Sequence, residues 1–226
     1  MLAAFALTTA ASVFAQGTVV FNNNLSGQRT HVWGPSTATP NLSLVGLGSN
    51  DTPTGSTAFA AAGMSLIGTG GATGKYGYQT TFTQLIGAAG SNTAESSLVP
   101  LGQTTTFRSG TGLGLIAGIT STLSGSPAIV VDAPFATFEI VAWDNSSGSY
   151  PTWTQAQVAW LAGTIAAGKS AAFNVSAIGG GLNTPPNLNN MGNNLTSFNL
   201  YFIPEPSSLA LAGLGAAALM IFRRRK

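Results

Sequence analysis

One histidine and a few scattered carboxylates are the side chains of this chain that could carry out acid–base chemistry. His31 is the single histidine, and its ordinary pKa lies near neutrality. A Ser-His-Asp arrangement would need a serine and one of three aspartates, Asp51, Asp132 or Asp144, beside it. No G-x-S-x-G nucleophile elbow supports this, because Gly63-Met-Ser-Leu-Ile departs from the pattern at its last position. We therefore predict a structural histidine and no catalytic residue.

Paired carboxylates could instead hydrolyse a glycosidic bond. Besides the aspartates, the carboxylates of residues 16–203 are Glu95, expected in a loop, and Glu139, expected in mid-strand opposite an apolar face. Nothing in the sequence pairs them. Residues 144–149, Asp-Asn-Ser-Ser-Gly-Ser, are partly similar to a calcium-binding turn but lack its further acidic positions, which favours an Asx-turn. With no cysteine to supply a thiolate, we predict neither a metal site nor a cofactor.

Four tryptophans offer a third kind of chemistry, because indole rings stack on sugar rings. A carbohydrate-binding function would need at least two of them exposed on one face, whereas core packing explains them otherwise. They are Trp33, Trp143, Trp153 and Trp160.

The elements that would position these residues are predicted to be mainly β-strands. Residues 76–86, 136–143 and 197–203 alternate apolar and polar side chains with period two, as half-buried strands do. Residues 154–162 form the one good helix candidate, which Thr154 can cap and in which the apolar residues Val158, Leu161 and Ile165 share a face at helical spacing. Eight or nine short strands separated by turn residues predict an antiparallel β-sandwich. We expect the core to include Phe138, Ile140, Phe198 and Leu200.

Charge is scarce throughout, at 6% of residues against about 25% in ordinary soluble proteins. In residues 16–203, four cations face five anions, which leaves a net charge of −1. This balance gives no support to a nucleic-acid partner. The cations are Arg29, Lys75, Arg108 and Lys169, and the anions are the five carboxylates named above.

The C-terminal segment has three consecutive parts. Pro204 and Pro206 flank Glu205 and disfavour a helix there. Residues 207–222 are predicted to form a transmembrane helix of about 24 Å, slightly short for a ~30 Å hydrocarbon core. Four cations then resist translocation and keep the C terminus cytoplasmic. They are Arg223, Arg224, Arg225 and Lys226.

This order of parts closely resembles the PEP-CTERM sorting signal of Gram-negative bacteria. The resemblance covers roughly the last tenth of the chain. It implies processing at the Pro-Glu-Pro motif by an exosortase, a membrane-embedded cysteine protease, and sorting to the surface or to an exopolysaccharide matrix. The alternative is an ordinary tail anchor preceded by a chance Pro-Glu-Pro.

The N terminus is consistent with export. Residues 1–14 are apolar and small, and Val13-Phe-Ala15 is a small-x-small site for signal peptidase cleavage between Ala15 and Gln16. The alternative is a buried N-terminal strand or helix. The residues after Ala15 are also similar to the mature start common among PEP-CTERM proteins of the Verrucomicrobia type.

Three segments are therefore predicted: a signal peptide (1–15), an exported β-sandwich domain (16–203) and a sorting signal (204–226). We expect a transient inner-membrane anchor followed by release to the cell surface or extracellular matrix. Expected partners are signal peptidase, an exosortase and exopolysaccharide. The function that best fits is a non-catalytic structural or adhesive role, with a carbohydrate-binding module and a secreted hydrolase as alternatives.

Overall fold

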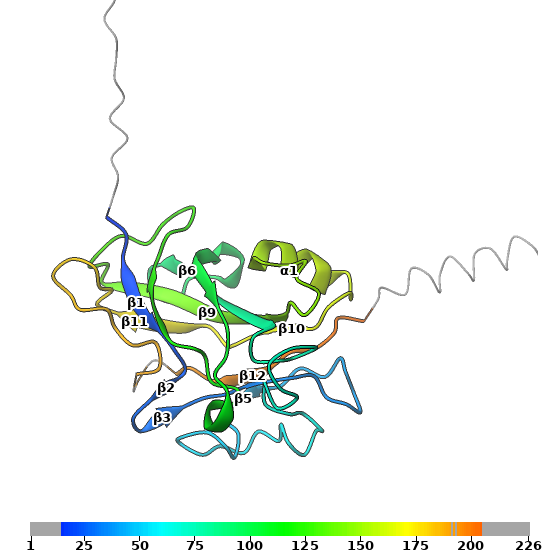
Figure 1. The fold of residues 1–226 in the computed structure, drawn as a ribbon. Helices are drawn as coiled ribbons and strands as arrows, with labels where there is room; N and C mark the ends of the chain where they lie inside the picture. The colour runs from blue at the N-terminus through cyan, green and yellow to red at the C-terminus, as the bar shows by residue number, and fades with distance from the viewer. Residues whose placement is uncertain (1–14, 191, 193, 205–226) are drawn as a thin grey trace, which may run out of the picture.

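The computed structural model describes residues 15–190, 192 and 194–204 of the 226-residue chain. These residues form mainly β-structure in antiparallel sheets with one α-helix, which confirms the predicted fold at that level (Figure 1). The described residues include twelve strands rather than eight or nine, because four of them are only two residues long. The strands are β1 (Thr18–Phe21), β2 (Asn24–Leu25), β3 (Gln28–Arg29), β4 (Val32–Trp33), β5 (Val45–Gly46), β6 (Thr81–Ala89), β7 (Val99–Thr105), β8 (Ile119–Thr122), β9 (Phe135–Asp144), β10 (Ala167–Lys169), β11 (Phe173–Ser176) and β12 (Ser197–Asn199).

Strand β9 is the centre of a five-stranded antiparallel sheet. β6 pairs along one edge of β9 over nine residues and is followed outward by β7, while β10 and β11 pair along the other edge. The sequence of β9, FATFEIVAWD, is rich in aromatic and β-branched residues that favour a pleated, packed backbone. Every residue of β9 after Phe135 is buried, so both faces of this strand are covered.

The two faces of β9 contact different parts of the molecule. Phe138, Ile140 and Ala142 face the main core, whereas Val141 and Trp143 belong to a second apolar cluster against the helix. The predicted core residues Phe138, Ile140, Phe198 and Leu200 are all buried, which confirms that prediction.

Helix α1 (Trp153–Leu161) covers the second face, above β9 and β10 in Figure 1. Its N-cap is Thr152, so the prediction that Thr154 caps it is wrong. The N–H of Trp153 donates instead to Oε1 of Gln84, on β6. The prediction that Val158 and Leu161 line the buried face is also wrong, since they are 68% and 56% exposed. The indole rings of the helix occupy that face instead, because they remove more apolar surface from water.

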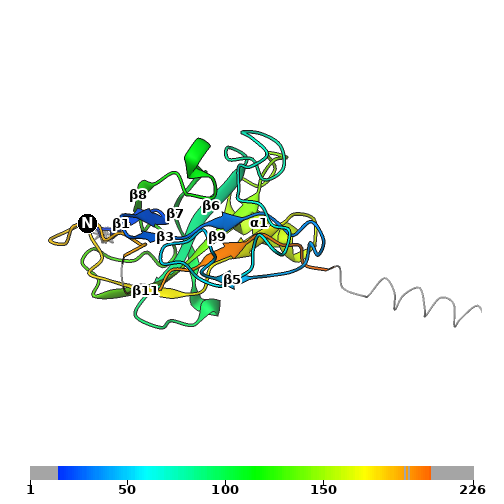
Figure 2. The ribbon, with the colours of Figure 1, turned by 90° about the horizontal axis from the view of Figure 1, so that it is seen from below.

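The remaining strands of the described residues form three smaller sheets. β12 lies between β4 and β5, pairing parallel with β4 and antiparallel with β5. β1 pairs with β8, which lies beside β7 (Figure 2). The first and last described residues emerge on opposite sides of the body (Figures 1 and 2).

Two further predictions concern the strand at residues 76–86 and the helix at residues 207–222. The predicted strand 76–86 begins only at Thr81, because residues 76–80 form turns in which Tyr76 has a φ of 60°. The predicted transmembrane helix, 207–222, lies outside the described residues. Among the residues that the structure describes, no helix has the length and apolar character needed to cross a membrane.

Candidate functional site

The single histidine does lie beside an aspartate and a serine. Nδ1 of His31 is 2.7 Å from Oδ1 of Asp51, and the hydroxyl of Ser197 donates to Oδ2 of the same carboxylate at 2.7 Å. The backbone N–H of His31 donates back to that hydroxyl at 2.6 Å. All three residues are buried.

This geometry differs from a catalytic triad in the partner of the serine. The Ser197 hydroxyl donates its proton to Asp51 rather than to the imidazole, so the ring is not placed to act as its general base. Asp51 is additionally held by the N–H of Gly48. The network joins β12 to the segment before β4 and to the turn at Asp51, which makes it a structural connection between distant parts of the chain.

The other two aspartates each fix a turn. Oδ1 of Asp144 accepts the N–H of Ser146 at 3.0 Å, which is the Asx-turn favoured over a calcium site. Asp132 accepts the N–H groups of Leu182 at 2.7 Å and Asn183 at 2.9 Å, and these bonds lower the pKa of its carboxyl group. Within the described part of the chain, no three acidic, histidine or cysteine side chains gather as metal ligands.

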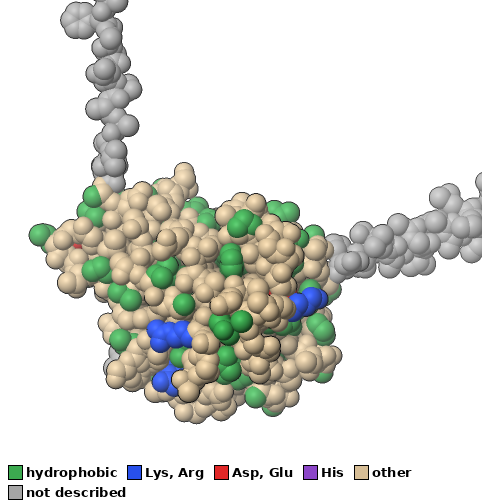
Figure 3. Space-filling view, in the orientation of Figure 1, with side chains coloured by type: hydrophobic (Ala, Val, Ile, Leu, Met, Phe, Trp, Pro, Cys, Tyr) green, Lys and Arg blue, Asp and Glu red, His purple; other side chains and the backbone are tan. Residues whose placement is uncertain are grey.

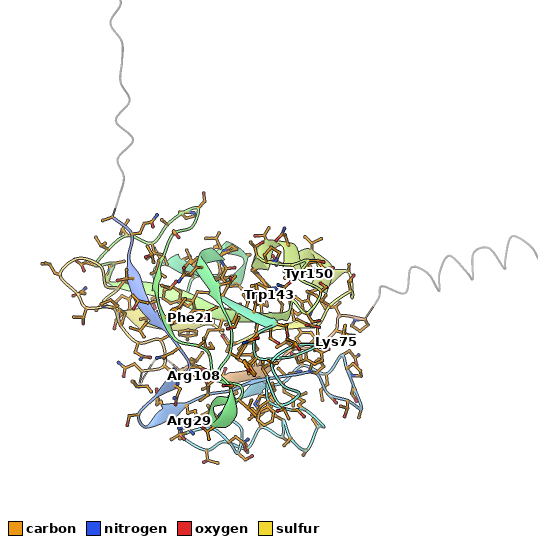
Figure 4. The ribbon with its side chains drawn as sticks, viewed as in Figure 1. Phe21, Arg29, Lys75, Arg108, Trp143 and Tyr150 are labelled. Atoms are coloured by element: carbon orange, nitrogen blue, oxygen red, sulfur yellow. The ribbon has the colours of Figure 1, made fainter. Side chains whose placement is uncertain are left out.

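All four tryptophans are buried, so they do not provide the exposed aromatic face that the carbohydrate-binding alternative required. Trp33 stacks on Phe59 with ring centroids 5.2 Å apart. Trp143, Trp153 and Trp160 form a continuous series of ring contacts beneath α1. Trp143 lies next to Tyr150 in Figure 4, and its Nε1 donates to the Tyr150 carbonyl at 2.7 Å.

A cleft of about 580 Å³ lies beside α1, on the helix-covered face of the five-stranded sheet. Its apolar lining comes from three elements, and its polar lining includes both charges and an amide. The lining residues are Ile86, Leu98, Pro100 and Trp153, together with Glu95, Ser96, Gln157 and Lys169. Glu95 and Ser96 belong to the short 3-10 helix η1 (Glu95–Ser97) that precedes β7.

Lys169 brings the two glutamates of the body together at this cleft. Its ammonium group forms an ion pair with Glu95 and lies 4.0 Å from Oε2 of Glu139. Glu139 on β9 pairs with Ile86 on β6, and Ile86 is one of the residues that line the cleft. The sequence predicts Glu95 in a loop and Glu139 in a strand, and it indicates neither a pairing between them nor a role for Lys169. In the structure, the Lys169 ammonium group on β10 lies close to both carboxyl groups.

Glu139 is the most perturbed carboxyl group near the cleft. It is only 3% exposed, and its Oε2 atom has no hydrogen-bond partner. Burial and, secondly, the nearby charge of Glu95 raise the pKa of Glu139 to about 7, while Lys169 acts in the opposite direction. This arrangement provides one carboxyl group that changes protonation near neutrality and one exposed carboxylate beside it.

The predicted processing residues lie at the edges of the described chain. Ala15 and Gln16 are both exposed, and Gln16 forms a β-bridge with Val130. Pro204 is exposed, two residues after the N–H of Phe202 donates to the Pro40 carbonyl. Glu205, Pro206 and the four terminal cations lie outside the described residues.

Comparison with known proteins identifies the tail. Residues 202–226 match the family model of the PEP-CTERM protein-sorting motif, which confirms the resemblance found in the sequence. The match indicates exosortase-dependent sorting to the cell surface, with export through a C-terminal signal that anchors the chain transiently in a membrane. The chain matches no curated protein and no solved structure.

Proposed function

We propose that this exosortase substrate is a non-catalytic protein of the cell surface or extracellular matrix, with a structural or adhesive role among exopolysaccharides. The observation that carries the proposal is the joining of a PEP-CTERM motif to a folded domain with almost no surface charge. On the face shown in Figure 3, backbone and uncharged polar side chains predominate, with scattered apolar side chains and a few Lys and Arg. Hydroxyl and amide groups of this kind suit a hydrated polysaccharide.

The domain organisation follows from the same proposal. Signal peptidase would cleave between Ala15 and Gln16, and the exosortase would act at Pro204, Glu205 and Pro206. The two ends of the domain emerge on opposite sides, so the N-terminal segment and the sorting tail leave the folded domain separately. We also retain the β-sandwich as the proposed arrangement of residues 16–203.

The contacts and burial of the candidate catalytic side chains support a non-catalytic role. The His31 network is buried and directs its serine to a carboxylate. At the cleft, Glu95 is paired with Lys169, and Oε2 of Glu139 is shielded from solvent. The secreted-hydrolase alternative still has one favourable observation, which is the convergence of Glu95 and Glu139 on Lys169.

Fractionation of the native host tests the proposal. We expect the processed protein in the extracellular matrix fraction of cells that make exopolysaccharide, and in the free medium of cells that do not. Deleting the gene should weaken cohesion of the matrix. Processed protein that remains in the medium of both strains would contradict a matrix role, and loss of glycan-degrading activity on deletion would favour the hydrolase.

A further inference from the structure

We propose that the cleft between α1, η1 and β10 binds an uncharged sugar unit of a polysaccharide, with Glu139, Lys169 and Gln157 contacting its hydroxyl groups. This inference rests on the proposed matrix function and names the ligand class and the site. It replaces the stacking of exposed tryptophans as the means of recognition.

The shape and lining of the cleft fit a saccharide. A volume of about 580 Å³ is in the range of small-ligand sites and accommodates one or two sugar rings. Ile86, Leu98 and Pro100 supply apolar contacts for the C–H face of a ring. Polar groups from two further elements line the same cleft, with Glu95 and Ser96 on η1 and Gln157 on α1.

The Oε2 atom of Glu139, which has no hydrogen-bond partner, can bond to a hydroxyl group of a ligand. Nearly all buried polar atoms have a hydrogen-bond partner, and leaving one without a partner is unfavourable. Oε2 of Glu139 has none in the described structure, and it is directed toward Lys169, which lines the cleft. A quarter of the Lys169 side chain is exposed, so a rotation of this flexible chain opens a path from the cleft to Oε2.

The mixture of donors and acceptors favours hydroxyl groups over charged ligands. Lys169 only donates, Glu95 only accepts, and Gln157 does both. Glu139 accepts when ionised and donates when protonated, and a pKa of about 7 makes both forms available near neutrality. A hydroxyl group can match each of these partners because it both donates and accepts.

A uronic acid fits the same cleft poorly. Its carboxylate would meet Glu95 and Glu139, and the one ammonium group beside them is already paired with Glu95. Within the described residues, the charged groups that line the cleft are Glu95 on η1 and Lys169 on β10, and Glu139 on β9 is buried with its Oε2 atom 4.0 Å from the Lys169 ammonium group. Repulsion between like charges should therefore exclude acidic polysaccharides from this site.

Isothermal titration calorimetry on the purified full-length protein tests the proposal. The probes are a neutral glucose hexasaccharide, a neutral mannose hexasaccharide and a uronic-acid hexasaccharide of the same length. We expect at least one neutral probe to bind, at least tenfold more tightly than the uronate. Failure of both neutral probes to bind at millimolar concentration, or equal affinity for the uronate, would overturn the inference.

Matched variants on α1 locate the binding. Gln157→Ala should weaken binding of the neutral probe about tenfold, whereas Gln155→Ala, an exposed change two residues away, should leave it unchanged. Glu139→Gln keeps the shape of the side chain and should also weaken binding about tenfold. Binding that survives both cleft changes would place the sugar elsewhere.

A protein that binds sugar but is absent from the matrix would contradict the proposed function alone. A protein that is present in the matrix but binds none of the neutral probes would contradict only this inference.

Discussion

The ammonium group of Lys169 lies 4.0 Å from Oε2 of Glu139, which is too far for a hydrogen bond yet close enough for attraction between charges. Lys169 forms its direct ion pair with Glu95, whose side chain is largely exposed. The buried carboxyl group is thus only partly compensated. Its protonation is therefore linked to the stability of the fold.

Replacing Glu139 with Gln should flatten the dependence of stability on pH. The pKa of Glu139 rises to about 7 in the folded state from 4.5 in the unfolded state, so the folded protein binds more protons between these values. Stability contributed by this group is fully present below pH 4.5 and declines as pH rises through 7. The loss amounts to about 3 kcal/mol. Urea unfolding from pH 4.5 to 8 measures it.

In the same experiment, Glu139→Gln should match the unmodified protein near pH 4.5 and exceed it in stability at pH 8. A comparison of the two proteins cancels the titration of groups that the substitution does not affect. Equal slopes for both proteins across this range would show that Glu139 titrates normally.

Phe138 should be one of the most costly residues to truncate. Its side chain is fully buried on β9 and contacts Phe173, with ring centroids 6.2 Å apart. Phe138→Ala should lower the free energy of unfolding by about 3–5 kcal/mol, because it removes apolar contacts and leaves a cavity. The control is Phe135→Ala on the same strand, where the side chain is 48% exposed and the expected change is below about 1 kcal/mol. Similar losses for both would contradict the assigned orientation of β9.

The sequence predicted β9 well but not its surroundings. Alternation of Phe138, Ile140 and Ala142 predicted one buried face, and this was confirmed. The same alternation could not show that Glu139 is buried as well, because the groups near its carboxyl group, Lys169 on β10 and Glu95 on η1, are distant in the chain. Period-two patterns describe one strand and its core face, whereas the second cover depends on tertiary packing.

Helix α1 is a second case in which a local sequence pattern did not predict the tertiary packing. Its position was predicted to within one residue, yet the spacing of Val158 and Leu161 predicted the wrong buried face. The large rings of Trp153 and Trp160 decide which side packs on the sheet. Likewise, no local pattern joins His31 to Ser197, which lies 166 residues away. The cleft was missed for this reason, since Glu95, Glu139 and Lys169 come from three separate elements.

Asp51 should be essential for stability rather than for catalysis. Its buried carboxylate holds His31, Ser197 and the N–H of Gly48. Asp51→Ala leaves these buried groups unpaired and should lower the free energy of unfolding by about 3–5 kcal/mol. The exposed neighbour Asn50 provides the control, since Asn50→Ala should change stability by less than about 1 kcal/mol. Thermal unfolding of both variants measures the difference, and a stable Asp51→Ala protein would contradict a structural role.

Asp132 should hold the loop at residues 181–183. Asp132→Ala removes the acceptor for the N–H groups of Leu182 and Asn183, so both amides should exchange with deuterium faster. The lowered pKa of Asp132 means that this protection persists at neutral pH and is lost on acidification below the usual range of an aspartate. Leu182→Ala is the control, because this side chain is almost fully exposed and its N–H is retained. Unchanged exchange in Asp132→Ala would show that the loop is held by other contacts.

The C-terminal motif should separate membrane insertion from processing. Glu205→Ala leaves the apolar residues 207–222 and the terminal cations unchanged, so the chain should still insert but accumulate in its full-length form. Neutral replacements at residues 223–226 should instead weaken the stop to translocation, and unprocessed chains should pass through the membrane. Mass spectrometry of the C terminus, in cells with and without an exosortase, distinguishes these outcomes. If the mature protein keeps Arg225 and Lys226 in both strains, the segment acts as a permanent anchor, and the assigned processing does not occur.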